Sequence, residues 1–337
     1  MALFSRRPKS SSEQDAGTPD AASTAESEET QETQESASAS AEETPQVGIS
    51  VSSFGGLGAA PTPASASAAA APQAEADGIP GLTDNILLRD AIAALPEEAN
   101  GTQVVGVARQ LLQGQLFLRV RGDARSLAAE GKELPLAVAS IEDTPFVLVF
   151  SGGSALQAAV RADGQLDSSA MSQDAGIVLR SVLAGPYGGI ILDHASRQSP
   201  IVIPRQLIER ALEESDDEFT VKTLLAGERT SETPALVAAA LPHVPLWLAA
   251  NRAREEDEWG LAESRNASGE RFLEVFSHPL EVLAMGRGDQ PMPIRIDQLA
   301  SGFEGDDGLT GIVVDPAGPW IQLSRADLAS AFAAAEE

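Results

Sequence analysis

The chain has 337 residues, carries a formal net charge of −27 at pH 7 and contains no cysteine. Its length exceeds that of one ordinary domain, and the lack of cysteine excludes disulfides, thiolate metal sites, thiol nucleophiles and persulfide carriers. The residues up to Pro80 include 3 basic and 12 acidic side chains, and the residues beyond Pro80 include 20 basic and 38 acidic ones. Because both parts repel phosphate and no basic stripe is visible, we expect no nucleic-acid partner.

The acidity has two interpretations, and the sequence leaves both open. A charge far from zero keeps a surface well solvated without any specific partner. The alternative is a basic protein partner. Residues 1–8 contain two arginines but no apolar run after them, and no stretch is as long as a membrane span. We therefore expect a cytoplasmic protein with no membrane partner.

Residues 1–80 consist mainly of Ser, Ala, Glu, Thr, Gln and Pro, which predicts a disordered acidic tail because little apolar surface is available for a core. One apolar island, residues 47–57, interrupts this tail. It is either residual hydrophobicity without a role or a docking segment that adds as a strand to a sheet edge, its own or a partner's. The side chains that would make such a contact are Ile49, Val51, Phe54 and Leu57.

Folded structure is predicted to begin near Pro80. Asp84 is expected to cap a first helix that ends at Pro96, because apolar residues recur between them at helical spacing. A second helix is expected to open at Thr102 and to stop at Gly114 in a left-handed conformation.

Short runs of β-favouring residues separated by Gly, Asp and Pro follow these helices. They predict strands at residues 116–120, 134–138, 146–150, 190–192 and 201–203. Helices are predicted after Ser151–Ser154, around residues 177–183, and from Pro204, which suits a first helical turn.

Three of these segments return later in the same order. Residues 146–151 return as 272–277, residues 189–193 as 311–315, and residues 201–205 as 321–325. The offset drifts only from 126 to 122 to 120 residues, as small loop deletions would produce. The repetition predicts two copies of one small domain.

The second copy is expected to repeat the plan with fewer residues. Thr233 and Pro234 open a helix, strands lie near residues 246–249, 261–263 and 271–276, and a final helix starts at Ser324 with Asp327 in a capping box and Leu328, Ala331 and Phe332 facing the core. Residues 219–225 read as one more strand or as a rigid connector. The predicted fold class is α+β: two tandem copies of a small mixed β-sheet domain packed with helices. The expected boundaries are a tail at 1–80, a first domain at 81–214, a connector at 215–232 and a second domain at 233–337.

No recognisable catalytic constellation is present. His243 and His278 lack a second ligand at metal spacing, so we expect them to be structural or exposed, with no metal and no cofactor. Asp193, His194 and Arg197 follow a predicted strand, where open sheets often bind ligands. Adjacent residues of one loop seldom point together, and the counterpart loop from Asp315 lacks an imidazole. An ordinary polar turn is therefore favoured over catalysis.

Two arginines occupy equivalent positions at the starts of the last helices of the two copies, Arg205 and Arg325. A cation there opposes the helix dipole, so something must offset it. The candidates are an acidic residue within the domain, an anionic ligand, or a carboxylate across the interface between the copies.

The order and spacing of several segments resemble the SseB family, named for enhanced serine sensitivity, and look closest to its tandem-domain actinobacterial members. The segments are residues 84–89, 111–120, 182–187 and 219–225. The resemblance covers nearly all of the chain beyond Pro80. It implies no established reaction, cofactor or catalytic residue. The family name suggests a connection with serine metabolism or sulfur transfer, which this cysteine-free chain could serve only indirectly.

The expected function is protein–protein interaction or regulation without catalysis. The competing hypothesis is a binder of a small anionic metabolite, or an enzyme, that uses the cleft between the copies. His194, Arg205 and Arg325 would be its contacts.

Overall fold

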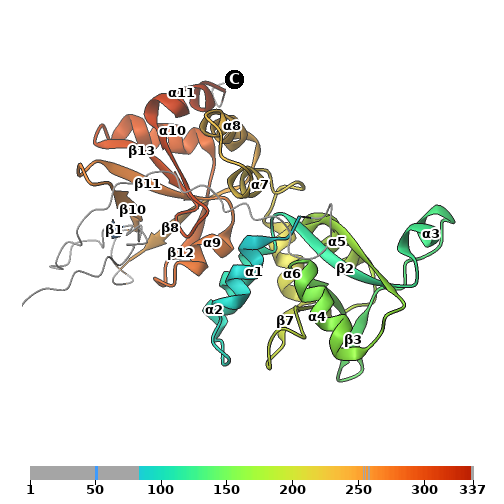
Figure 1. Cartoon of the computed structure of the whole chain (residues 1–337). Helices are drawn as coiled ribbons and strands as arrows, with labels where there is room; N and C mark the ends of the chain where they lie inside the picture. The colour runs from blue at the N-terminus through green and yellow to red at the C-terminus, as the bar shows by residue number, and fades with distance from the viewer. Residues whose placement is uncertain (1–49, 52–82, 253, 255, 257–258, 335–337) are drawn as a thin grey trace, which may run out of the picture. The chain divides into compact units, whose positions relative to one another are not determined.

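The computed structural model describes residues 50–51, 83–252, 254, 256 and 259–334. Contacts between residues group Gln46–Glu337 into one unit. The predicted tail lies outside the described residues, except for Ser50–Val51, which form strand β1 (Figure 1). Ile49, Phe54 and Leu57 of the apolar island also lie outside them, so its docking through side chains stays a prediction.

The first repeat runs from α1 to α6. Its elements are α1 (Ile86–Ala93), α2 (Gly101–Gln110), β2 (Gln115–Arg121), α3 (Ala124–Ala129), β3 (Val138–Ile141), β4 (Thr144–Phe150), α4 (Gly153–Asp163), β5 (Ser168–Asp174), α5 (Ala175–Ala184), β6 (Gly189–Leu192), β7 (Ile201–Pro204) and α6 (Arg205–Glu213). The strands form a sheet in the order β5-β2-β4-β6-β7, and β3 pairs with β4. Only the β4–β6 pairing of this sheet is parallel among the described strands.

The second repeat runs from α7 to α11. Its elements are α7 (Thr220–Ala226), α8 (Thr233–Ala240), the 3₁₀ helix η1 (Leu241–His243), β8 (Leu246–Asn251), β9 (Gly260–Leu261), β10 (Glu263–Arg265), β11 (Arg271–Phe276), α9 (Pro279–Ala284), β12 (Gln290–Ile294), α10 (Ile296–Gly305), β13 (Leu309–Val314), β14 (Ile321–Ser324) and α11 (Arg325–Ala334). The main path of its sheet is β12-β8-β11-β13-β14, and β11–β13 is parallel. Strand β9 pairs with β8, β10 pairs with β11, and β1 pairs with β10.

The two sheets are separate and have the same strand order. β12, β8, β11, β13 and β14 take the places of β5, β2, β4, β6 and β7, and the parallel pair lies at the same position in each sheet. Helices α4 and α9 follow the central strands, and α6 and α11 follow the last ones. The predicted α+β fold with two tandem copies is confirmed.

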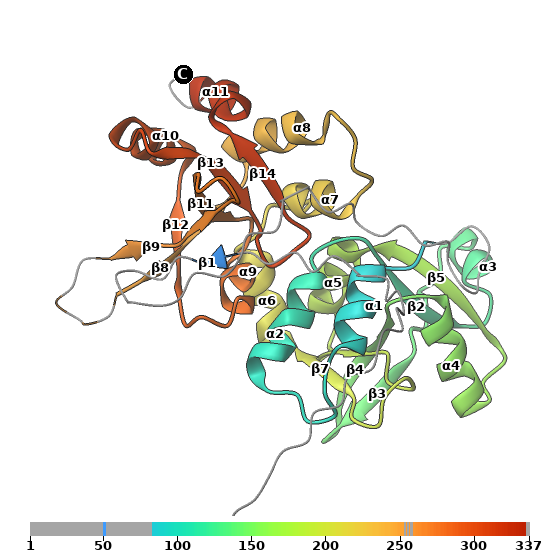
Figure 2. The same ribbon diagram turned by 60° about the vertical axis from the view of Figure 1, so that its left-hand side comes forward.

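Side chains on both faces of the first sheet are buried. Leu116 and Leu118 of β2 pack in a core with α1, α2, α5 and α6, whereas Phe117 packs in a second core with α4. Successive residues of a strand point to opposite faces, so a sheet covered on both sides needs a continuous apolar run rather than an alternating one. That explains why Leu116, Phe117 and Leu118 of β2 (Figure 2) are apolar in succession, although Arg119 interrupts the run before Val120.

One side-chain clasp occurs in both repeats. The backbone N–H and hydroxyl of Ser151 donate to the carboxylate of Asp193 at 2.8 and 2.6 Å. Ser277 donates in the same way to Asp315 at 2.8 and 2.5 Å. Both aspartates have positive φ, 41° and 51°. The clasp fixes the loop after β6 or β13 to the end of β4 or β11, so the duplication extends to buried polar contacts.

Two predicted helix starts need correction. The N-cap of α1 is Asn85, which accepts from Leu88 N–H at 3.1 Å, whereas Asp84 accepts from Gly153 N–H at 2.9 Å and so caps α4. Helix α2 begins at Gly101 after a capping box of Asn100 and Gln103, and not at Thr102. In each case a neighbouring polar residue satisfies the free helical N–H groups.

Two strand predictions also need correction. Residues 219–225, read as a strand or a connector, include helix α7 from Thr220, and its Val221 and Leu225 are buried in the core of the second repeat. The strand predicted at 134–138 begins only at Val138, and Leu136 makes an isolated bridge.

Among the helices that the structure describes, none has the length and apolar character needed to cross a bilayer.

Candidate functional site

The loop after β6 does not gather its polar residues into one site. Asp193 is buried and bonded to Ser151, and burial raises the pKa of its carboxyl. His194 is half-buried with its ring 5.8 Å from that of Phe150, and burial together with the Arg119 guanidinium lowers its pKa. Each side chain therefore has its own packing environment.

Arg197, the third candidate of this loop, stabilises the end of α1. Its guanidinium donates to the carbonyl oxygens of Ile92, Leu95 and Pro96 at 3.2, 2.8 and 2.6 Å. A cation at a helix C-terminus interacts favourably with the dipole and with the free carbonyl groups. Arg197 is thus engaged in a structural contact.

Arg205 and Arg325 have equivalent roles, which explains their position at the start of a helix. Each reaches back to the carbonyl end of the preceding helix. Arg205 donates to Leu183, Gly185 and Tyr187, and Arg325 to Phe303, Asp306 and Leu309. The negative end of α5 or α10 offsets the unfavourable dipole of α6 or α11. Arg205 also pairs with Glu209 at 2.8 Å.

A buried ionic cluster was not found from the sequence. Glu281 of α9, 1% exposed, is bonded to Lys222 of α7 and, at 2.8 Å, to Arg109 of α2. Burial alone would raise the pKa of Glu281, but the two cations hold it below its usual value. Arg109 also donates to the Gly318 carbonyl at 2.6 Å. The cluster joins α2 of the first repeat to α9 and the β13–β14 loop of the second. The available signal was a single charge within each short apolar helix, α7 and α9.

His278 is buried at the N-terminus of α9, while His243 is exposed. The Nδ1 atom of His278 accepts from Leu280 N–H at 3.0 Å, and Nε2 lies 2.9 Å from the Ala211 carbonyl oxygen, to which it donates. Burial lowers the pKa of His278 to about 4, with Lys222 acting in the same direction. A proton on Nδ1 would remove the acceptor for Leu280. His278 is therefore a structural residue, as expected.

We expect acid to destabilise the protein through His278. Because its folded pKa is lowered, the unfolded chain binds more protons between pH about 4 and 6.5, so stability is lost as the pH falls through that window. Asp315 opposes this, since burial raises its pKa to about 6. Relative to His278→Asn, which keeps a capping side chain, wild type should lose about 2 kcal/mol between pH 7 and pH 5. Urea unfolding at both pH values measures it; an unchanged difference would show that the pKa of His278 is the same in the folded and the unfolded chain.

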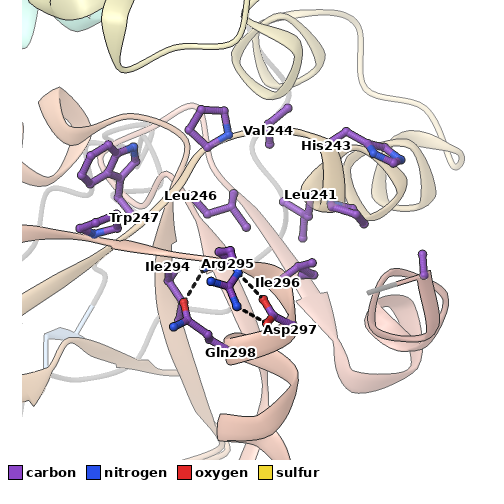
Figure 3. Close-up of a pocket in the computed structure, with 14 residues that line it drawn as sticks. Leu241, His243, Val244, Leu246, Trp247, Ile294, Arg295, Ile296, Asp297 and Gln298 are labelled. Atoms are coloured by element: carbon purple, nitrogen blue, oxygen red, sulfur yellow. Dashed lines mark hydrogen bonds and ion pairs between the residues drawn. The ribbon is translucent and has the colours of Figure 1, made fainter. Parts of the chain in front are cut away.

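A groove of about 990 Å³ opens at one end of the second sheet. Its walls come from η1 with the link to β8, the start of β8, the end of β12, the start of α10, and Ala334 of α11. The apolar lining residues are Leu241, Pro242, Val244, Pro245, Leu246, Trp247, Pro293, Ile294 and Ile296. Figure 3 shows these side chains around the opening. None of the residues proposed from the sequence as ligand or partner contacts lies in this lining.

Polar groups lie along one side of the groove. Arg295 bonds both carboxylate oxygens of Asp297, and its backbone N–H donates to Gln298 Oε1 at 3.0 Å (Figure 3). The indole N–H of Trp247 is buried and has no hydrogen-bond partner among the described residues. The groove thus combines an apolar lining with polar groups on one side, the usual composition of a site that binds a ligand side chain.

The corresponding surface of the first repeat is occupied. Asp297 in the groove corresponds to Gly176 at the start of α5, and a Cβ placed on Gly176 would lie 3.2 Å from Phe219 Cε2. Phe219 is buried in the core of the first repeat, although it precedes α7 of the second. The Asp217 carbonyl accepts from Arg180 of α5 at 2.9 Å. In the first repeat, Phe219 therefore covers the surface beside Gly176. In the second repeat, the described residues leave the equivalent surface open as the groove.

Comparison with protein-family models, with curated proteins and with solved structures finds no match for this chain.

Proposed function

We propose that the chain is a cytoplasmic, SseB-like protein–protein interaction module. Its second repeat receives an aromatic side chain of a partner protein in the groove between η1, β8, β12 and α10. The observation that carries this proposal is the filled counterpart: Phe219 packs beside Gly176 in the first repeat, whereas the lining of the second-repeat groove is open and apolar.

The expected affinity is modest. Burial of one Phe side chain contributes about 1.5–3 kcal/mol. This contribution is partly offset by the ordering of the bound segment. Such a groove suits a reversible regulatory contact, in which several weak interactions act together.

A peptide of residues 214–219, the segment that fills the counterpart, is the probe. Binding of the labelled peptide to the full chain is measured by fluorescence anisotropy, in enough salt to screen the acidic charges of both. We expect the peptide to bind, and we expect binding to be lost when Phe219 of the peptide is replaced by alanine. Pro245→Asp with Pro293→Asp, two exposed positions of the groove wall, should weaken binding at least about tenfold, which corresponds to 1.4 kcal/mol.

Leu236→Asp is the matched control, since Leu236 is an exposed residue of α8 outside the groove lining. It should bind the peptide like wild type. Equal binding of the phenylalanine and alanine peptides, or equal loss in the control, would exclude the groove as the binding site.

A further inference from the structure

Strand β5 is an edge strand of the first sheet, paired on one side with β2. At its two ends Ala175 N–H donates to the Gly114 carbonyl and Gly122 N–H to the Asp167 carbonyl. Along an antiparallel ladder, hydrogen-bonded pairs alternate with non-hydrogen-bonded pairs. Counted from these two ends, Phe117↔Ser172 and Arg119↔Ala170 are non-hydrogen-bonded pairs. Ala170 and Ser172 therefore turn their backbone N–H and C=O groups away from β2.

The equivalent edge of the second sheet is closed by proline. Pro291 and Pro293 of β12 pair with Ala249 and Trp247 of β8, the register positions that Ala170 and Ser172 hold in β5. Proline has no N–H, so the outward edge of β12 lacks the donors that an added strand needs. Proline at an edge is a known way to prevent strand addition. The edge at β5 has no such protection.

The surroundings of β5 indicate what it can receive. Leu166, just before the strand, is 83% exposed, and Ile177, just after it, is 46% exposed. Asp167 and Asp174 are exposed at its two ends. Helix α3 contacts β5 where Ala124 N–H donates to Ser169 Oγ at 2.8 Å, beside the strand's first residues (Figure 2). Apolar side chains at both ends, with carboxylates next to them, suit an extended segment that has basic ends.

We propose that β5 is a docking edge for an extended segment of a partner protein, which adds to the first sheet as an antiparallel strand with apolar side chains and flanking Lys or Arg. The ladder supplies two outward N–H and two outward C=O groups, at Ala170 and Ser172. A second copy of this chain is the poorer occupant, because two chains of net charge −27 repel each other. This edge is independent of the groove in the second repeat.

Hydrogen exchange of the full chain tests the edge, with an acetylated Lys-Thr-Val-Thr-Val-Thr-Lys amide as the probe. In the free protein the Ala170 and Ser172 amides should exchange fast, while Met171 and Gln173, bonded to β2, stay protected. At a peptide concentration ten times its Kd, exchange at Ala170 and Ser172 should slow about tenfold. Protection of these two amides without peptide, at low protein concentration, would show that another segment of the chain already covers the edge and would overturn the proposal.

The double variant Ala170→Pro with Ser172→Pro gives β5 the pattern of β12. It should keep the Tm of wild type, because neither N–H serves the β2 ladder, and should no longer bind the peptide, as measured by the fluorescence anisotropy of a labelled copy. Met171→Pro is the contrasting change, since it removes a ladder donor and should lower the Tm. If the double variant does not fold, the exchange measurement on wild type still decides. Binding of the 214–219 peptide should be unchanged in the double variant, which separates this edge from the groove.

Discussion

Replacing Glu281 by glutamine is expected to lower the free energy of unfolding by about 3–5 kcal/mol. The carboxylate is 1% exposed and lies between the side chains of Lys222 and Arg109, which are 6% and 13% exposed. Removal of one partner from a buried ion pair leaves the other charges without compensation in a medium that solvates them poorly. Urea unfolding at pH 7 measures the loss.

Glu209→Gln is the control for this prediction. Glu209 also pairs with an arginine, Arg205, but 41% of its side chain is exposed, and an exposed pair contributes about 0–1 kcal/mol. We expect a change within that range. If the two substitutions cost the same, the Glu281 cluster is open to water, and the contact between α2 and α9 is weaker than described.

Replacing Gly311 by alanine is expected to destabilise the protein by about 4 kcal/mol or more, a size that few point mutations reach. The new Cβ would lie 2.0 Å from the carbonyl oxygen of Leu323 on the paired strand β14. A Cβ placed on Gly189 in the first repeat would lie 2.1 Å from the carbonyl oxygen of Ile203, so the same result is expected there. The obstacle is backbone held in a ladder, which no rotamer change relieves. Thermal and urea unfolding measure the effect.

Gly302→Ala separates this steric effect from the general effect of adding a methyl group. Gly302 lies inside α10, and no atom lies within 4 Å of a Cβ placed there. Alanine favours a helix over glycine by about 1 kcal/mol, so this variant should be slightly more stable than wild type. A tolerated Gly311→Ala would mean that β13 and β14 do not approach as closely as described.

The duplicated plan could be predicted because its central strands are apolar and recur at nearly constant offsets. The edge strands could not be predicted. Strand β5 reads Ser-Ser-Ala-Met-Ser-Gln-Asp, and β12 contains two prolines, so neither has β propensity, and both are strands because β2 or β8 pairs with them. Helix α7 was misread for the opposite reason. Its Thr and Val residues favour strands locally, but burial of Val221 and Leu225 in the second core determines the result.

The sequence predicted an ordinary polar turn in the β6–β7 loop, and the contacts that its side chains make there depend on distant elements. The guanidinium of Arg197 donates to carbonyl oxygens at the end of α1, about a hundred residues earlier in the chain. The groove was not predicted, since its walls come from five elements and its lining residues look like ordinary core or turn residues in the sequence. In the first repeat Phe219 lies beside Gly176, the position equivalent to Asp297, and the sequence does not reveal this contact.

The most direct measurement uses 5-fluorotryptophan in place of the three tryptophans, Trp247, Trp259 and Trp320. Only Trp247 lines the groove. On titration with the 214–219 peptide, its ¹⁹F resonance should shift in a saturable manner, the other two should stay in place, and the alanine peptide should have no effect. A shift at Trp259 or Trp320 without one at Trp247, or no difference between the two peptides, would contradict the account of an aromatic anchor bound by the second repeat.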